Sequence, residues 1–198
     1  LDGDGWEDLI HGVAHHPHGY RIYHNLKGHF FEDVTEQSNL PRLLFGEGSV
    51  AAAKLSDVQV KPTGVSLADF DLDGRVDLYV TRGAGGSFKV GSWIDGKAGK
   101  VSHNQLLRNT GDWQFDDVTN GAPLDGGNRS TSNAVWLHAN ADLRPDIYVI
   151  DEFGDGQLLL NQPGGSFTGH ELNDQPTDFG SMGLTTGDIN NDGLADLY

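Results

Sequence analysis

The sequence is organised around one stretch, Asp69-Phe-Asp-Leu-Asp-Gly-Arg-Val-Asp77, which places four carboxylates within nine residues. Carboxylates packed this closely repel one another unless a cation lies between them. Oxygen ligands at alternate positions, with a glycine that permits a sharp turn, form a cage for a hard cation, and Ca²⁺ suits it best. This stretch therefore predicts a calcium-binding loop, whose positions we number from 1 at Asp69 to 9 at Asp77.

The same pattern recurs along the chain. It is nearly complete in Asp188-Ile-Asn-Asn-Asp-Gly-Leu-Ala-Asp196, and its later part opens the chain as Asp2-Gly-Asp-Gly-Trp-Glu-Asp8. A degenerate copy, His138-Ala-Asn-Ala-Asp-Leu-Arg-Pro-Asp146, keeps position 9 but loses the first aspartate and the glycine. The aspartates at position 5 are 69, 69 and 50 residues apart: Asp4, Asp73, Asp142 and Asp192. Repeats of this length indicate a propeller or a solenoid.

The spacing divides the chain into three repeats and the start of a fourth, at about residues 1–63, 64–131, 132–182 and 183–198. In each repeat an apolar run of small residues precedes the Asp-rich loop and a β-prone run follows it. A third run then ends in Asn, and a turn leads into a fourth. In the second repeat these runs are 64–68, 76–81, 105–109 and 114–119.

The remaining repeats show the corresponding runs at 8–10, 21–25, 30–35, 133–137, 146–150, 157–161, 166–168 and 183–187. Four short strands per repeat, joined by turn residues, predict an all-β fold made of β-propeller blades with four antiparallel strands each. No segment keeps apolar residues at the spacing of 3.6 that a helix requires, so we expect few helices.

The ends of the chain fall inside the repeat pattern. Leu1 stands at position 2 of a loop, and Tyr198 comes shortly after another loop. Closed propellers have roughly four to eight blades. We therefore expect the chain to be a partial propeller of about three repeats, either from a longer protein or completed by self-association.

Two stretches exceed the repeat length, 41–63 and 82–104, and both are interpreted as long loops. Loops on a rigid scaffold often carry the binding residues. Insertions of this kind are also simply tolerated in many proteins.

The chain is strongly acidic, with 29 Asp and Glu against 13 Lys and Arg and a formal net charge of −16. This balance argues against a nucleic-acid partner, because phosphates require a basic surface. The absence of Cys excludes a disulfide framework and a thiolate metal site. No apolar run approaches the roughly 18 to 20 residues that cross a bilayer, so we expect no membrane span in this segment.

These features resemble the FG-GAP or VCBS repeat, known from the propellers of integrin α-subunits and from many secreted proteins. Phe179-Gly180, nine residues before Asp188, matches the dipeptide that names the repeat, and Phe45-Gly46 is a second candidate. Arg21-Ile-Tyr-His-Asn25 followed by Phe31-Glu-Asp-Val-Thr-Glu36 most resembles the branch of cartilage acidic protein and its bacterial relatives. The resemblance implies a secreted or cell-surface β-propeller, extracellular or periplasmic, with calcium in the Asp-rich loops.

The resemblance also implies which residues bind calcium. In the second loop they are Asp69, Asp71, Asp73, the Arg75 carbonyl and Asp77. In the fourth loop they are Asp188, Asn190, Asp192, the Leu194 carbonyl and Asp196. The first loop retains Asp2, Asp4, the Trp6 carbonyl and Asp8. The third offers only Asn140, Asp142 and Asp146, with His138 at position 1. Since imidazole is a poor ligand for Ca²⁺ and Leu143 resists the turn that glycine permits, we expect that loop to be empty or weak.

Three alternative interpretations of the acidic loops fit the sequence less well than a calcium-binding loop between two strands. An EF-hand requires a bidentate Glu at loop position 12 and flanking helices, whereas position 12 here is Val80 and the flanks are β-prone. Plain solvated turns would not account for the recurrence. A glycosidase pair of carboxylates is conceivable, but calcium accounts for the spacing more simply.

Two further motifs stay open. His11, His15, His16 and His18 could bind a transition metal, or could simply lie in an exposed loop. Asn128-Arg-Ser130 is a glycosylation sequon if the protein is secreted by a eukaryote.

Sequence signatures of catalysis are missing. There is no Gly-x-Ser-x-Gly, no His-Glu-x-x-His and no P-loop. Gly46-Glu-Gly-Ser-Val-Ala51 only faintly resembles a dinucleotide fingerprint, without a βαβ context. We therefore expect a non-catalytic, calcium-stabilised module that binds a protein or a glycan in adhesion. The alternatives are a subunit of an extracellular filament or surface layer, and a lectin-like part of a carbohydrate-active enzyme.

Overall fold

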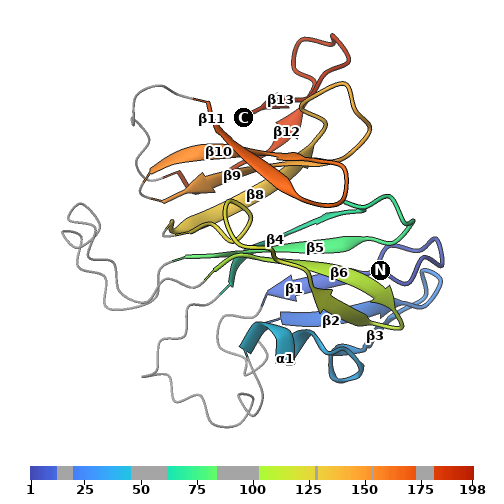
Figure 1. Ribbon diagram of the computed structural model, residues 1–198. Helices are drawn as coiled ribbons and strands as arrows, with labels where there is room; N and C mark the ends of the chain where they lie inside the picture. Colours follow the sequence, from blue (N-terminus) through green and yellow to red (C-terminus); the bar gives the residue numbers. More distant parts are fainter. Residues whose placement is uncertain (13–19, 46–61, 84–102, 128, 153, 173–180) are drawn as a thin grey trace.

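The chain folds into consecutive antiparallel sheets (Figure 1). The structure is a computed structural model, and it describes all residues except 13–19, 46–61, 84–102, 128, 153 and 173–180. The first sheet contains β1 (Leu9–Gly12), β2 (Tyr20–Asn25) and β3 (Phe31–Asp33). The second contains β4 (Pro62–Ala68), β5 (Asp77–Arg82), β6 (Gln105–Gly111) and β7 (Gln114–Asp117).

The third sheet repeats this arrangement. It contains β8 (Thr131–Leu137), β9 (Asp146–Asp151), β10 (Gly154–Asn161) and β11 (Phe167–Glu171). A short fourth sheet pairs β12 (Thr186–Gly187) with β13 (Asp196–Leu197). Within each sheet, strands that are consecutive in sequence pair antiparallel, so each sheet is a meander. The predicted all-β fold of four-stranded antiparallel blades is confirmed, as a partial β-propeller.

The middle sheet is covered on both faces, and the alternation of side chains along its strands explains how. Leu78 and Val80 on β5 and Leu107 on β6 belong to a core shared with the first sheet. Tyr79 on β5 and Leu106 on β6 belong to a second core, shared with the third sheet. Successive side chains of a strand point to opposite faces. All six residues of β5 are therefore buried, as expected for the strand of a blade that packs between two others.

Local structure departs from the expectations in two places. The run 30–35 is a strand only to Asp33, because the Asp33 and Thr35 side chains accept hydrogen bonds from the backbone nitrogens of Thr35 and Ile22 and turn the chain into η1 (Thr35–Gln37). Within the stretch 41–63, the prediction of a long loop is wrong for residues 41–45, which belong to α1 (Leu40–Phe45), and for residues 62–63, which begin β4. The Leu40 and Leu44 side chains, one helical turn apart, are buried in the first core.

The helices of the described part are short. None of them is long and apolar enough to cross a membrane.

Candidate metal centre in the Asp-rich loops

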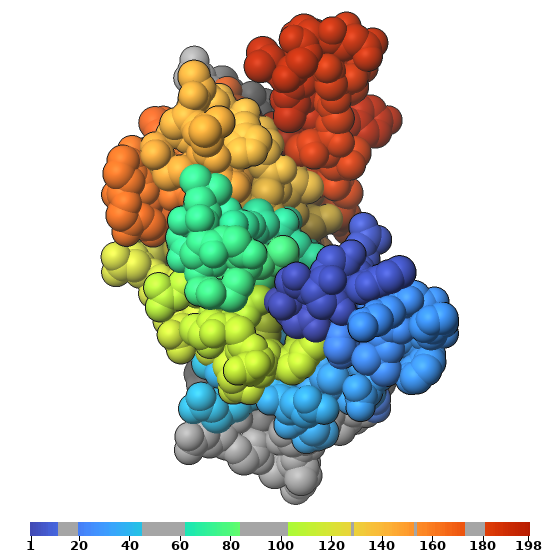
Figure 2. All heavy atoms as spheres, turned by 90° about the vertical axis from the view of Figure 1, so that its right-hand side faces the viewer, coloured from blue at the N-terminus to red at the C-terminus, as the bar shows by residue number. Residues whose placement is uncertain are grey.

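Each Asp-rich loop occupies the same place in its sheet. The loops of the second, third and fourth sheets connect β4 to β5, β8 to β9 and β12 to β13, and the first loop leads into β1. The first three loops lie at the right in Figure 1 and face the viewer in Figure 2, and the fourth extends from β12 and β13 at the top of both views. The recurring sequence motif is therefore a recurring connection at one end of the blades.

The second loop gathers three carboxylates around a common point. Asp69 accepts hydrogen bonds from the backbone nitrogens of Asp73 at 3.0 Å and Gly74 at 2.8 Å. The backbone is left-handed at Leu72, with φ of 61°, and at Gly74, with φ of 88°, so the chain curls around the Asp69 carboxylate. One oxygen each from Asp69, Asp71 and Asp73 then lies within 4.8 Å of the others.

This donor set fits calcium. Oxygens on opposite sides of a Ca²⁺ ion lie about 5 Å apart, because each Ca–O bond is about 2.4 Å. Asp71 and Asp73 are exposed to solvent and Asp69 is partly exposed, so an ion can reach the cluster. An ion here would stabilise a cluster of negative charges that otherwise repel one another.

The fourth loop has the same framework. Asp188 accepts hydrogen bonds from the nitrogens of Asp192 at 3.0 Å and Gly193 at 2.9 Å, and Asn191 has a left-handed φ of 60°. The Asn190 Oδ1 atom accepts from the Asp192 nitrogen at 3.0 Å. An amide replaces one carboxylate, so this loop has one carboxylate fewer than the second loop.

The carbonyl ligands proposed from the sequence are Trp6, Arg75 and Leu194, all at position 7. In each case the backbone nitrogen of that residue donates at 2.9 Å to the aspartate at position 5. This shared bond holds position 7 over the loop. The Arg75 guanidinium also pairs with the Asp73 carboxylate, so an incoming cation would compete with it.

The aspartate at position 9 has a different role from the remaining carboxylates. Asp77 is fully buried and accepts hydrogen bonds from the backbone nitrogens of Phe70 at 3.1 Å and Asn109 at 2.8 Å. Burial is the main reason that the pKa of the Asp77 carboxyl is raised to about 6; the two hydrogen bonds oppose the increase, and the charges of Asp71 and Asp73 add to it. Each of its oxygens keeps a second lone pair. Asp77 thus anchors the base of the loop, and a cation bound above it would favour its ionised form.

Position 9 makes similar bonds in the remaining loops. Asp8 and Asp146 accept from the nitrogens of Asn25 and Asn161 at the ends of β2 and β10. Asp146 and Asp196 accept from the nitrogens at position 2 of their own loops. These aspartates tie each loop to its own sheet.

An Asn near the end of the third strand of a sheet also bonds to the Asp-rich loop of the preceding sheet. The Asn109 amide donates to Val76 of its own loop at 3.0 Å and to the Leu1 carbonyl of the first loop at 2.8 Å. The Asn161 amide donates to Pro145 of its own loop at 3.1 Å and to the Phe70 carbonyl of the second loop at 2.8 Å. We call this bridge, made by Asn109 and Asn161, the asparagine clamp.

The third loop departs from this geometry in its backbone. Ala141 and Leu143, at positions 4 and 6, do not adopt the left-handed conformation that Leu72 and Gly74 show in the second loop. His138 at position 1 contacts the Arg144 carbonyl at 3.3 Å, and Arg144 pairs with Asp142. The backbone at positions 4 and 6 and the His138 contact distinguish this loop from the second, whereas the Arg144–Asp142 pair has a counterpart in Arg75–Asp73. Weak or absent calcium binding by this loop stays a prediction.

Restoring position 1 and position 6 should create a site in this loop. We expect His138→Asp combined with Leu143→Gly to raise the calcium stoichiometry by one, because a carboxylate and a permissive turn residue return together. Isothermal titration calorimetry measures the stoichiometry, with Leu143→Gly alone as the control. An unchanged stoichiometry in the double variant would show that Asn140, Asp142 and Asp146 do not form a ligand set.

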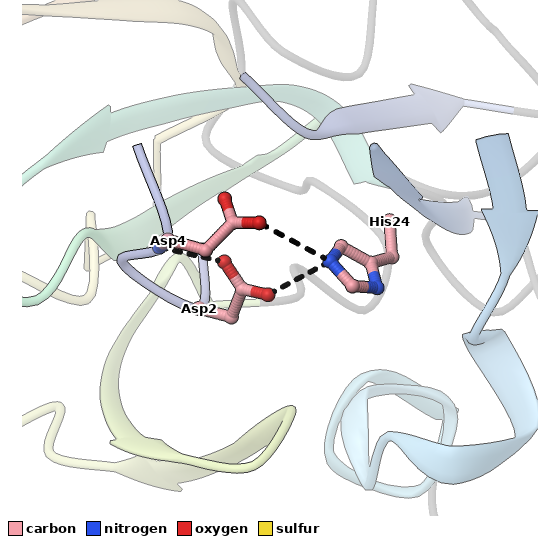
Figure 3. A group of neighbouring side chains, drawn as sticks. All are labelled: Asp2, Asp4 and His24. Carbon is pink, nitrogen blue, oxygen red and sulfur yellow. Dashed lines mark hydrogen bonds and ion pairs between the residues drawn. The ribbon is translucent and has the colours of Figure 1, made fainter. Parts of the chain in front are cut away.

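The first loop brings in a residue that the sequence analysis did not connect with it. The His24 Nε2 atom on β2 lies 2.9 Å from Asp2 Oδ2 and 3.8 Å from Asp4 Oδ2 (Figure 3). The pairing of β2 with β1 places His24 there. The sequence held one signal for this contact: His24 immediately precedes Asn25, the Asn that ends the run. In the next two sheets the corresponding residues are Arg108 and Leu160, so the histidine is a departure from the repeat.

Several sequence predictions fall outside the described residues. These are His15, His16 and His18, Asn128 of the sequon, the dipeptide Phe179-Gly180, the stretch Gly46–Ala51, and residues 46–61 and 84–102 of the two predicted long loops. Arg82, the first residue of the second predicted loop, instead ends β5. His11 is exposed on β1, opposite Arg21.

Comparison with known families supports part of the resemblance. Residues 139–198 match the family model described as FG-GAP-like repeat. The matched segment contains β9 to β13, most of the third loop and all of the fourth, so it spans most of the third repeat and the start of the next. The finer resemblance to VCBS repeats and to the cartilage acidic protein branch stays a prediction. No curated protein matches the chain.

Proposed function

We propose that this chain is a calcium-stabilised, non-catalytic module of an extracellular β-propeller, which binds a protein or glycan ligand in adhesion. The observation that carries the proposal is the cluster of Asp69, Asp71 and Asp73 oxygens within 4.8 Å of one another. The first and fourth loops, with Asp2, Asp4, Asp188 and Asp192, are further cation sites in this proposal.

A structural role for calcium follows from what the loops connect. Position 9 ties the second and third loops to their own sheets, and the asparagine clamp ties the first and second loops to the sheet that follows. An ion that holds a loop in its folded geometry therefore also favours the packing of adjacent sheets. Metal binding is then coupled to folding.

The geometry of the carboxylates favours this role over hydrolysis. A glycosidase needs one carboxyl to donate a proton and another to act as base or nucleophile. Both oxygens of Asp69 accept backbone hydrogen bonds, and Asp77 is fully buried. These carboxylates organise their own loop.

An extracellular location agrees with the exposure of the loops and with the FG-GAP-like repeat at residues 139–198. Calcium sites of extracellular modules are weak, with Kd of about 10⁻⁴ to 10⁻³ M, and they fill only where calcium is abundant. Glycan-array and protein-binding assays with the calcium-loaded chain would identify the protein or glycan that the module binds. Cleavage of a polysaccharide in the same assays would overturn the non-catalytic part.

The calcium site itself is tested by Asp71→Asn. Asp71 is exposed, so its replacement by a neutral side chain of equal size should leave the fold intact and remove one anionic ligand. We expect the calcium affinity of the second loop to fall by at least about tenfold, since a ligand counts for no less than the residues that support one. Isothermal titration calorimetry measures the loss.

The matched control is Asp116→Asn. Asp116 is an exposed aspartate of the same sheet, on β7, and it pairs with Arg108 at 3.4 Å outside the loop. Calcium binding should not change in this variant. Equal losses in both variants would point to diffuse attraction by the acidic surface and would contradict the loop as a calcium site.

A further inference from the structure

The first loop differs from the second in the chemistry of its ligands. Its cluster consists of Asp2, Asp4 and the His24 imidazole, with all three ligand atoms within 4.8 Å of one another. Figure 3 shows the His24 ring pointing toward the two carboxylates, which stand on the opposite side of the cluster. The second loop offers only carboxylate oxygens at the same positions.

The His24 Nε2 atom makes no hydrogen bond within the described part of the chain. His24 Nε2 is buried, and no neighbour meets it with hydrogen-bond geometry, although Asp2 Oδ2 is only 2.9 Å away. A buried nitrogen without a hydrogen bond is costly. A cation shared by the nitrogen and both carboxylates would satisfy all three groups at once.

The surroundings hold the ring in this orientation. The Trp113 ring, on the turn between β6 and β7 of the second sheet, packs against His24 with 5.1 Å between ring centres. The loop backbone is fixed by hydrogen bonds from Asp4 N to Asp2 and from Trp6 N to Asp4. The three ligands therefore come from two segments that are positioned independently of an ion.

The corresponding residues of the next two sheets do not reproduce this arrangement. Arg108 pairs with Asp116 on the neighbouring strand, and Leu160 carries no ligand atom. Three sheets in the described part of the chain have the strand that carries this position. Among them, only the first places a nitrogen ligand beside its Asp-rich loop.

We propose that Asp2, Asp4 and His24 form a site for a divalent transition metal ion such as Zn²⁺, distinct in preference from the calcium sites of the second and fourth loops. Imidazole suits Zn²⁺ and its neighbours in the first transition row, whereas Ca²⁺ selects oxygen ligands. This inference rests on the proposed function, in which the first loop is a cation site. It adds which kind of cation that loop prefers. The propeller then carries two kinds of metal on the same side.

The test is a titration of the chain with Zn²⁺ in the presence of saturating Ca²⁺, followed by calorimetry. We expect one Zn²⁺ event that calcium does not displace. His24→Gln should weaken it by at least about 10- to 100-fold, the range for residues that only support a metal ligand. Substitution with Co²⁺ gives a second readout, because its visible absorption bands report a nitrogen ligand and should change in His24→Gln.

The controls separate this site from further metal-binding groups. His15→Gln combined with His16→Gln tests the His-rich stretch, and His103→Gln tests an exposed histidine near an aspartate, with Asp125 at 3.7 Å. Both should leave the Zn²⁺ event unchanged. If the event is lost in these variants and kept in His24→Gln, the proposal is overturned. Absence of any Zn²⁺ event would overturn it too and leave His24 as an ion-pair partner of Asp2.

The outcome is independent of the calcium proposal. Asp71→Asn should weaken calcium binding by the second loop at least about tenfold and leave Zn²⁺ binding intact. Loss of Zn²⁺ binding in His24→Gln together with calcium binding that is insensitive to Asp71→Asn would refute the calcium loop and support the transition-metal site. If instead Zn²⁺ binding is insensitive to His24→Gln while calcium binding falls in Asp71→Asn, only the transition-metal site is refuted.

Discussion

Removal of calcium should lower the melting temperature of this chain by about 10 to 20 °C. An ion at about 100 times its Kd stabilises the folded state by about 2.7 kcal/mol per site, and the second and fourth loops provide two such sites. For a chain of this size, each kcal/mol shifts the melting temperature by about 2 to 4 °C. The measurement is a thermal melt in saturating Ca²⁺ and in excess EGTA, followed by circular dichroism.

The control for this experiment is Asp71→Asn combined with Asp192→Asn. Because the double variant lacks a ligand in both loops, EGTA should barely change its melting temperature, which should resemble that of the calcium-free parent. Restoring Ca²⁺ to the parent should restore its stability. A parent whose melting curve is the same in Ca²⁺ and EGTA would rule out calcium as a structural element of the fold.

Loss of the asparagine clamp should have the second largest effect. Asn161→Ala removes the amide that donates to the Phe70 and Pro145 carbonyls at 2.8 and 3.1 Å. Asn161 is 1% exposed, so water does not readily replace the amide, and each orphaned acceptor costs about 1 to 3 kcal/mol. We expect a loss of about 2 to 4 kcal/mol in the free energy of unfolding, measured by urea denaturation.

Asn25→Ala is the matched control, because Asn25 occupies the same place at the end of β2. Its amide donates only to the exposed Glu7 carbonyl, and its Oδ1 accepts from the Gly28 nitrogen. Water can take over these bonds, so we expect a loss of about 1 kcal/mol or less. Comparable losses in the two variants would mean that the contact of Asn161 with the preceding loop contributes nothing. In that case the clamp does not couple the sheets.

Much of the fold could be predicted from the sequence because the signals repeat. The Asp-rich loop marks the first connection of each blade, and the β-prone runs beside it correspond to strands β4, β5, β8 and β9 within a few residues. A single run of this length would be ambiguous between strand and buried helix, but its recurrence beside the same loop removes the ambiguity. The match of residues 139–198 to an FG-GAP-like repeat agrees with this interpretation.

The helix α1 was not predictable in the same way. Its six residues, Leu40–Phe45, are too few for a helical period to emerge, and an isolated helix of this length is not stable in water. It forms because Leu40 and Leu44 enter the core between the first and second sheets. Tertiary packing decides this element, and a single sequence does not reveal the packing partner.

In the candidate site too, the contacts that are local in sequence were predictable, and the contacts between distant strands were not. The carboxylates at positions 1, 3 and 5 act locally, so their spacing alone predicted that Asp69, Asp71 and Asp73 converge. The engagement of Asp77 with Asn109, and of His24 with Asp2, depends on strands that are distant in sequence. The strand-ending Asn was visible as a pattern, but its donation to the loop of the preceding sheet appears only when the sheets are stacked.

The asparagine clamp has a consequence for how the chain is built during synthesis. The first and second loops each receive one hydrogen bond from the sheet that follows, since Asn109 donates to the first loop and Asn161 to the second. A chain emerging from the ribosome folds its N-terminal parts first. The second loop therefore remains without this bond until the third strand of the next sheet, β10, has been made. The contacts of the first and second loops are therefore completed only after the following sheet has formed, so these sheets acquire their full set of hydrogen bonds in the order of their synthesis.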